Sequence, residues 1–379
     1  MKYDGGDVSV ELIGYVPHTR ATETSGLWWS SDFDVDYIEE TALAHEEAGF
    51  DRVLVGMHAW SPDPWMIASH ILRITKKLKV LVAHRPGPVQ PTLAARQAIT
   101  LDRLAGGNRL GLHIITGAPG GELQRDGDTL ADDLRYDRTA EYIDVLRKTW
   151  ESDQPFDHSG KYYTVKQGFS SVRPLAQPTV SFAGSSGGAL AAGPGRSDYY
   201  MVWGEPLAAS KETFDELHGL ANERGRPLNI SVSLRAIIAE TEAAAWQKAE
   251  DVYNRAASQL VTVGRADGNL KQMEQKADSV GASKLDVIAR EKDVHDERLW
   301  LGFTRLVGRG GSTATLVGTL DQVTDSYLRY YELGAGAFYL RGWDIAADAR
   351  EYGRELIPAL RQKIAEHDAR KTATHQAAE

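Results

Sequence analysis

Short apolar segments alternate with longer amphipathic ones along most of the chain. Eight of the short segments contain aliphatic and β-branched residues typical of buried strands, and they are Val10–Val16, Arg52–Gly56, Lys79–Ala83, Arg109–Ile115, Thr179–Ala183, Tyr199–Trp203, Ile230–Ala239 and Ala337–Arg341. Helical periodicity is clearest in Asp34–Ala48, Pro91–Leu104, Tyr136–Trp150, Ala243–Leu260, Leu320–Leu333 and Ala346–Glu366. Eight strands alternating with helices predict an α/β protein with a (β/α)8 TIM barrel. A doubly wound open sheet is the alternative, and it fits less well because no G-x-G-x-x-G follows the first strand.

Two segments interrupt this alternation. Lys161–Val165 predicts a strand on the surface, outside the barrel. Val261–Gly311 contains glycines and mixed charges and is too long for an ordinary connection, so it predicts a mobile lid or a disordered segment. We expect one domain over residues 1–379, with an insertion at 261–311 before the last strand and a flexible tail at 368–379.

Composition narrows the possible chemistry. The chain has no cysteine, which excludes disulfides, thiolate catalysis and thiolate metal sites, and its 11 histidines show no H-E-x-x-H spacing. A net charge of −10 argues against a nucleic-acid-binding protein. No apolar run approaches a membrane span and the first residues do not resemble a signal peptide, so we expect a cytoplasmic protein. Catalysis would then depend on His, Arg, Tyr, carboxylates or an organic cofactor.

The segment Pro178–Gly195 predicts a strand, a tight turn and the start of a helix. The turn reads Gly184-Ser185-Ser186-Gly187-Gly188 and leads into an Ala/Leu run. Such a turn directs backbone N–H groups and hydroxyls toward one point near the positive end of a helix dipole, which favours a phosphate. The chain lacks the G-x-x-x-x-G-K-[ST] loop of nucleotide hydrolases. A surface turn of small residues is the alternative interpretation.

In a TIM barrel the residues just after each strand face one shared bowl. Here those residues are rich in His, Arg, Trp and Ser, and they are His18, His58, Trp60, His84, Arg85, His113, Ser185, Ser186, Trp203, Arg235 and Arg341 to Trp343. Any one histidine could be a structural hydrogen-bonding residue, and each tryptophan could pack at the rim. Arg309 lies between glycines in the insertion, where we expect it to grip an oxyanion such as a sulfonate or phosphate. A solvated charged face is the alternative for the arginines from Arg290 to Arg309.

Several runs resemble the alkanesulfonate monooxygenases, a branch of the bacterial-luciferase-like flavin-dependent monooxygenases. The matching runs are G-F-D-R-V-L at 49–54, L-V-A-H-R-P at 81–86, P-T-L-A-A-R-Q at 91–97, L-D-R-L at 101–104, T-G at 116–117, G-S-S at 184–186 and W-G-E-P at 203–206. The similarity runs in order from about Val10 to Leu360. It implies a TIM barrel with a mobile insertion late in the chain.

The resemblance also implies a cofactor and a reaction. Reduced FMN (FMNH2) would bind with its phosphate at Tyr136, Ser185 and Ser186, and its ring would lie near five further residues, which are Met57, Ala83, His113, Thr116 and Trp203. Because the chain lacks a dinucleotide fingerprint, the reduced flavin should come from a separate NAD(P)H-dependent flavin reductase. With O2 it would oxygenate the sulfur-bearing carbon of an organosulfonate and release an aldehyde and sulfite. The family further implies a homodimer or homotetramer.

The substrate side departs from that family pattern. Ser233-Leu234-Arg235 stands where the alkanesulfonate enzymes carry Arg-x-His, and Gly342-Trp343-Asp344-Ile345 stands where they carry Gly-Tyr-Pro-His. Arg235 keeps a cation, His18 could take over an acid/base role, and Trp343 with Asp344 would suit a sugar ring. We therefore expect His18, Arg235, Arg309 and Trp343 as catalytic residues, and a polar sulfonate such as sulfoquinovose as substrate.

Four alternatives remain open from the sequence. The protein could be a simple alkanesulfonate monooxygenase or an F420-dependent oxidoreductase of the same superfamily. It could be a flavin-free carbohydrate-processing barrel, with Glu205 and Asp344 as the paired carboxylates. It could also be a flavin-binding protein without activity.

Overall fold

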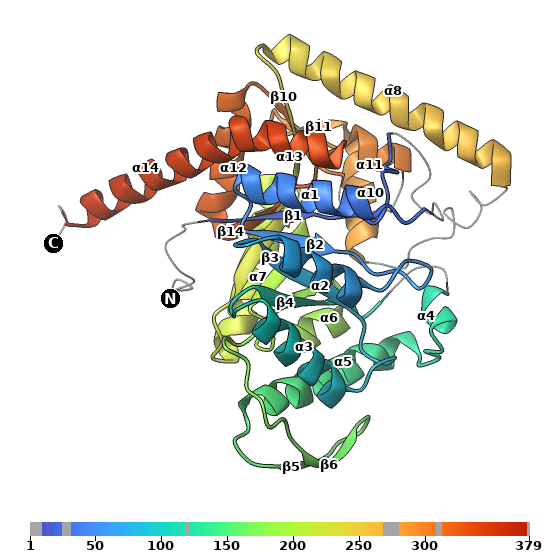
Figure 1. Cartoon of the computed structure of the whole chain (residues 1–379). Helices are drawn as coiled ribbons and strands as arrows, with labels where there is room; N and C mark the ends of the chain where they lie inside the picture. Colours follow the sequence, from blue (N-terminus) through green and yellow to red (C-terminus); the bar gives the residue numbers. More distant parts are fainter. Residues whose placement is uncertain (1–9, 25–31, 118–120, 268–279, 308–312, 377–379) are drawn as a thin grey trace.

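A closed barrel of eight parallel strands forms the centre of the molecule (Figure 1). The computed structural model describes residues 10–24, 32–117, 121–267, 280–307 and 313–376. The barrel strands are β1 (Glu11–Tyr15), β2 (Arg52–Val55), β3 (Lys79–His84), β4 (Leu110–Ile114), β7 (Thr179–Ala183), β8 (Tyr199–Trp203), β9 (Asn229–Ser233) and β14 (Ala335–Tyr339). They pair in the order β1-β14-β9-β8-β7-β4-β3-β2 and close on themselves. The predicted (β/α)8 TIM barrel is therefore confirmed, and the alternative of a doubly wound open sheet is wrong.

Helices surround the strands. The main ones are α1 (Val35–Ala48), α2 (Pro64–Ile74), α3 (Pro91–Leu104), α5 (Asp132–Glu151), α7 (Leu207–Glu223), α12 (Leu320–Leu333), α13 (Ile345–Arg354) and α14 (Leu356–Gln376). Local sequence sets their ends: Asp34 caps α1 by accepting from Tyr37 N at 2.9 Å, and Gly49 ends α1 with a φ of 85°. The far end of α14 projects from the barrel (Figure 1) and reaches Gln376, so much of the segment expected to be a flexible tail is helical. No described helix is long and apolar enough to cross a membrane.

Strand alternation divides the side chains between two environments. Ile13, Met201 and Tyr339 pack together within the barrel, whereas neighbours such as Leu12 and Val53 belong to the large core under the helices. The side chains that point into the barrel, as Ile13 does, and lie at the carboxyl end of a strand therefore face the barrel mouth.

A second sheet of four strands lies beyond the barrel mouth. Its order is β10 (Arg235–Ile238), β13 (Thr315–Gly318), β12 (Leu299–Trp300) and β11 (Val294–His295). The single strand expected over Ile230–Ala239 is wrong, because the chain changes sheets at Leu234. The N–H of Leu234 donates to Tyr339 in the barrel at 3.1 Å, whereas that of Arg235 donates to Ala314, next to β13, at 2.9 Å.

The predicted insertion contains regular structure in its described parts. α8 (Glu242–Asp267) lies across the top of Figure 1, and the chain continues with α10 (Val280–Glu291), β11, β12 and α11 (Gly302–Val307). Residues 268–279 and 308–312 lie outside the described residues. The expectation of disorder is therefore wrong for the described part, and movement of the insertion as a lid stays a prediction.

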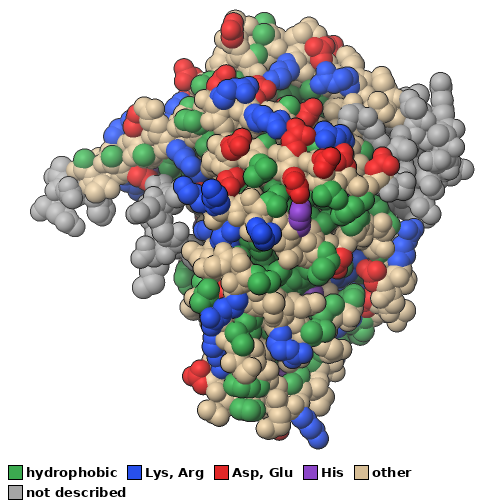
Figure 2. Space-filling view, in the orientation of Figure 1, with side chains coloured by type: hydrophobic (Ala, Val, Ile, Leu, Met, Phe, Trp, Pro, Cys, Tyr) green, Lys and Arg blue, Asp and Glu red, His purple; other side chains and the backbone are tan. Residues whose placement is uncertain are grey.

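The expected surface strand is part of a small hairpin. β5 (Phe156–Ser159) pairs antiparallel with β6 (Thr164–Gly168), away from the barrel at the bottom of Figure 1. On the face shown in Figure 2, acidic and basic side chains are interspersed with scattered hydrophobic ones.

Candidate active site at the carboxyl ends of the barrel strands

His113 occupies the barrel mouth beside the positions expected to hold a flavin ring. It pairs in register with Ala83 on β3 and with Ser181 on β7, and its Nδ1 lies 3.0 Å from Ser181 Oγ. Burial lowers the pKa of His113 to about 4. Its imidazole is therefore neutral near pH 7, so it can act there as a hydrogen-bonding group.

The turn after β7 opens at the same end of the barrel as Trp203 and Arg235. β7, β8 and β9 are parallel, and half-buried Trp203 at the end of β8 pairs in register with Ser233 at the end of β9. Arg235 follows two residues later. The structure thus brings the turn, the indole and the guanidinium to one end of the barrel.

Close packing shapes this turn. A Cβ on Gly184, whose φ is 143°, would lie 2.6 Å from the Cβ of Ala189, and a Cβ on Gly188 would lie 2.9 Å from the ring of Tyr136 on α5. The hydroxyl of Ser186 accepts from Ala189 N at 3.2 Å and caps α6 (Gly187–Ala192). Ser185 is exposed. Tyr136 therefore lies directly against the turn, which has no room for a side chain at Gly184 or Gly188.

The other two expected flavin contacts lie on loops at this end. Met57 is half-buried after β2, and Thr116 is buried after β4, where its hydroxyl donates to Thr139 Oγ1 on α5 at 3.2 Å. His18 is half-buried after β1, and its pKa is lowered by burial and by the nearby charge of His58. Arg309 lies outside the described residues.

Two arginines share one buried carboxylate at the mouth. Arg235 Nη2 lies 2.8 Å from Glu23 Oε1, and Arg341 Nη1 lies 3.1 Å from the same oxygen. Burial opposes ionisation of Glu23, but attraction to both guanidinium groups lowers its pKa to about 2. The cluster of Glu23, Arg235 and Arg341, here called the arginine cluster, therefore carries one net positive charge. Sequence reasoning missed Glu23 and did not select Arg341 as a catalytic residue.

Trp343 is buried against the arginine cluster. The Arg235 Cζ lies 4.0 Å from the centre of the Trp343 ring, and Phe303 of α11 packs on the indole at 4.3 Å between ring centroids. Asp344 caps α13 by accepting from Ala347 N at 3.3 Å. Both members of the expected sugar-binding pair thus have partners within the protein.

His84 has a structural role in this protein. Trp65 Nε1 donates to its Nδ1 at 3.2 Å, so Nε2 carries the proton and donates to the Tyr142 hydroxyl at 2.6 Å. Burial lowers the pKa of His84 to about 4. The neighbouring side chain, that of Ala83, points into the barrel, so His84 points outward to the helices. The expectation that His84 faces the mouth is therefore wrong.

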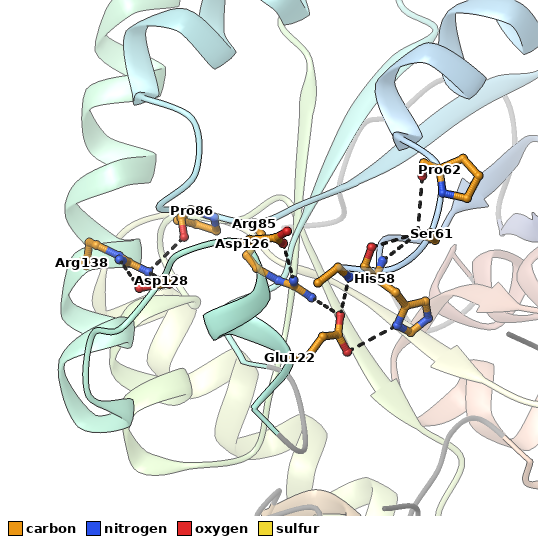
Figure 3. A network of polar contacts seen from close by, with 10 residues as sticks. His58, Ser61, Pro62, Arg85, Pro86, Glu122, Asp126, Asp128 and Arg138 are labelled. Carbon is orange, nitrogen blue, oxygen red and sulfur yellow. Dashed lines mark hydrogen bonds and ion pairs between the residues drawn. The ribbon is translucent and has the colours of Figure 1, made fainter. Parts of the chain in front are cut away.

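Arg85 is buried and belongs to a polar network that extends to the surface, seen in Figure 3. Its Nη2 lies 2.8 Å from Glu122 Oε1 on the short helix α4 (Glu122–Arg125), and that oxygen also accepts from Ala59 N at 3.0 Å. His58 Nδ1 lies 3.6 Å from the other oxygen of Glu122. Burial opposes ionisation of Glu122, but hydrogen bonds from His58, Arg85 and Ala59 lower its pKa to about 2. The network fastens the loop after β2 to α4, so Arg85 is also structural.

Comparison with known proteins places this barrel in a family. The family model described as luciferase-like monooxygenase matches residues 13–337, which is most of the chain. The chain belongs to the luciferase-like monooxygenase family.

Solved structures share the luciferase-like fold at low sequence identity. A riboflavin lyase with modified FMN and riboflavin is 20% identical with a TM-score of 0.73, covering 94% of this chain and 92% of that one. EDTA monooxygenase from Chelativorans sp. BNC1 is 18% identical with a TM-score of 0.72, covering 94% of each chain. An F420-dependent secondary alcohol dehydrogenase is 20% identical with a TM-score of 0.65, covering 93% of this chain and 99% of that one. The fold therefore occurs with both FMN and F420, and the choice of cofactor has to be argued from the site.

Proposed function

We propose that this luciferase-like monooxygenase uses FMNH2 and O2 to cleave the C–S bond of an organosulfonate. One oxygen atom of O2 enters the carbon that bears sulfur, and the other leaves as water, while FMNH2 is oxidised to FMN. The hydroxylated carbon then loses sulfite and becomes an aldehyde. The overall change is R-CH2-SO3⁻ + FMNH2 + O2 to R-CHO + HSO3⁻ + FMN + H2O.

The observation that carries this proposal is the arginine cluster at the barrel mouth. Its single net positive charge would be neutralised by one monoanion, and guanidinium groups match the several oxygens of a sulfonate through paired N–H donors. Arg341 also lies over the ring of Tyr15, with its Cζ 4.9 Å from the ring centre. Tyr15 is the last residue of β1, and its side chain points into the barrel. The arginine cluster therefore adjoins the interior of the mouth, where His113 and Trp203 lie.

The residues around the turn after β7 fit FMN. Gly184 and Gly188 keep side chains away from the turn, while Tyr136, Ser185 and Ser186 supply hydroxyls suited to the phosphate of a mononucleotide. Inside the barrel, the buried Ser233 Oγ has no hydrogen-bond partner among the described residues, so it has free capacity for a polar ligand atom. FMN, when reduced, supplies the two electrons needed to activate O2.

The supply of FMNH2 would require a second protein. The chain has no dinucleotide fingerprint, so we propose a separate NAD(P)H-dependent flavin reductase as the source of FMNH2. The contribution of this chain is to bind the flavin, to orient the sulfonate and to exclude water. Assembly as a homodimer or homotetramer stays a prediction from the family resemblance, as does a cytoplasmic location from the sequence.

The sugar sulfonate expected from the sequence has less support than the sulfonate group itself. One face of the Trp343 ring is covered by Arg235, and Asp344 caps α13. Sulfoquinovose therefore enters the test as one compound of a panel.

A sulfite-release assay tests the proposal. The protein would be supplied with FMN, a flavin reductase, NADH and catalase, and offered ethanesulfonate, octanesulfonate, sulfoquinovose and the carboxylate analogue propionate. We expect one sulfite per sulfonate consumed, and no sulfite without O2. Oxygen-independent turnover with reduced F420 would instead establish the F420-dependent alternative, and absence of sulfite from the whole sulfonate panel would reject the proposal.

A further inference from the structure

A cavity lies next to the arginine cluster, between α8, α13 and the start of β10. Its volume is about 340 Å³, near the lower end for small-ligand sites. Its wall includes apolar groups from Ala236, Ile237 and Val252, together with the rings of Trp343 and Tyr352. The proposed function does not use this cavity, because Arg235 and Arg341 do not line it.

Charged side chains lie where the cavity meets solvent. Lys248 of α8 pairs with Glu351 of α13 at 2.8 Å, and these side chains are 42% and 31% exposed. Arg255, which also lines the cavity, is exposed. The half-buried Asp348 and the exposed Asp344 also line the cavity, so it combines apolar groups with charged ones.

Trp343 contacts the arginine cluster and also lines the cavity. Its ring stacks on Arg235 at 4.0 Å and also forms part of the cavity wall. It is 4% exposed, yet its Nε1 has no hydrogen-bond partner among the described residues, although a buried indole N–H usually has one. Packing and the stacking on Arg235 thus hold the ring there, and its removal would break no hydrogen bond seen in the structure.

We infer that Trp343 is a specificity-determining residue. It separates the arginine cluster, where the sulfonate group would bind, from this cavity and so limits the enzyme to compact sulfonates. The inference rests on the proposed function. Shortening Trp343 would open the cavity toward the arginine cluster. The apolar tail of a long sulfonate would then occupy the cavity while its sulfonate stays on the arginine cluster.

Calorimetric binding of ethanesulfonate and octanesulfonate, with oxidised FMN present, tests this inference. We expect Trp343→Ala to raise the affinity for octanesulfonate relative to ethanesulfonate by at least about tenfold, the gain from burying two methylene groups. The matched control is Trp300→Ala. Trp300 is also buried and belongs to the same apolar cluster, where it packs on Tyr253, but it does not line the cavity.

A second variant shows whether any gain comes from the cavity. Val252→Phe, added to Trp343→Ala, would fill the cavity from α8 and should abolish the gain. If Trp343→Ala does not fold, Trp343→Leu takes its place with a smaller expected gain.

The outcomes separate the inference from the proposed function. If the wild-type protein binds ethanesulfonate but the folded Trp343 variant shows no relative gain, the inference is wrong and the proposed function stands. A wild-type protein that already prefers octanesulfonate also overturns the inference. If the wild-type protein binds neither sulfonate, the inference fails, and the proposed function is then decided by sulfite release from the whole sulfonate panel.

Discussion

Glu23 and Arg235 lie 212 positions apart in the chain, yet their side chains form an ion pair of 2.8 Å, with only 2% and 1% of their surface exposed. Arg341 binds the same carboxylate, so Glu23 is the group that holds two guanidinium groups at the barrel mouth. Loss of its charge would leave two buried cations facing each other.

Glu23→Gln should therefore destabilise the fold strongly. Removing one partner of a buried ion pair costs roughly 3–5 kcal/mol, and urea denaturation would measure this loss. Glu40→Gln is the control, because Glu40 also bridges two arginines, Arg20 and Arg350, but at the surface, where the loss should stay below about 1 kcal/mol. Equal losses for the two variants would contradict the role assigned to Glu23.

Arg341→Lys should weaken substrate binding without affecting the flavin. A lysine keeps the charge but lacks the planar pair of donors, and losing a hydrogen bond to a charged group corresponds to about tenfold or more in KM for the sulfonate. The FMN dissociation constant should not change. Arg350→Lys, which alters a surface pair with Glu40, serves as the control and should leave KM unaltered. A KM for Arg341→Lys equal to that of the wild-type protein would argue against the arginine cluster as the anion site.

Two adjacent glycines after β7 offer a matched pair of variants. A Cβ on Gly188 would meet the Tyr136 ring at 2.9 Å, whereas one on Gly187 meets nothing within 4 Å. Because overpacking of this kind costs about 1–3 kcal/mol, Gly188→Ala should weaken FMN binding by roughly tenfold, and Gly187→Ala should change it little. Quenching of FMN fluorescence on titration measures both. If the two variants bind FMN equally, the turn does not hold the cofactor as proposed.

Buried neutral histidines predict loss of stability in mild acid. Burial lowers the pKa of His45, His84 and His113 from 6.5 to about 4. As the pH falls, these histidines are protonated in the unfolded chain before they are protonated in the folded protein. The stability that they contribute is therefore fully present above pH 6.5 and is lost as the pH falls from 6.5 to 4. The slope near pH 5 should be about 4 kcal/mol per pH unit, which is three protons.

Denaturation in urea across this pH range measures that slope. His84→Gln should lower it by about one proton's share, roughly 1.4 kcal/mol per pH unit. His70→Gln is the control, because the His70 side chain is 39% exposed on α2. A slope that His84→Gln leaves unchanged would show that His84 is not a buried neutral group.

Elements with strong local signals were predictable from the sequence. The helix expected over Pro91–Leu104 matches α3, since Pro91 suits its first position and Gly106-Gly107 follows its end. The change of sheet at Leu234 was not predictable, because Ile230–Ala239 has aliphatic residues on both sides of the break and contains no Gly, Pro, Asn or Asp.

The placement of residues at the barrel mouth was predictable in part. The positions of His113 and Trp203 follow from where their strands end. Glu23 lies in a polar loop without periodicity, and its partners are far away in the sequence, so no local signal marks it. The outward position of His84 did have a signal, since it directly follows inward-facing Ala83 in a strand that alternates.

The pairing of β10 with β13 has a consequence for how this enzyme could diversify. These two strands are parallel neighbours that lie just before and just after the segment from Glu242 to Ala314. The segment leaves from the end of β10 and returns at the start of β13, at opposite ends of two paired strands. Both attachment points are therefore anchored in one sheet, so the length and content of the segment can change at little entropic cost to the rest of the molecule. A chimera that exchanges this segment with that of a distant homologue should keep the barrel folded while placing a different segment next to the second sheet.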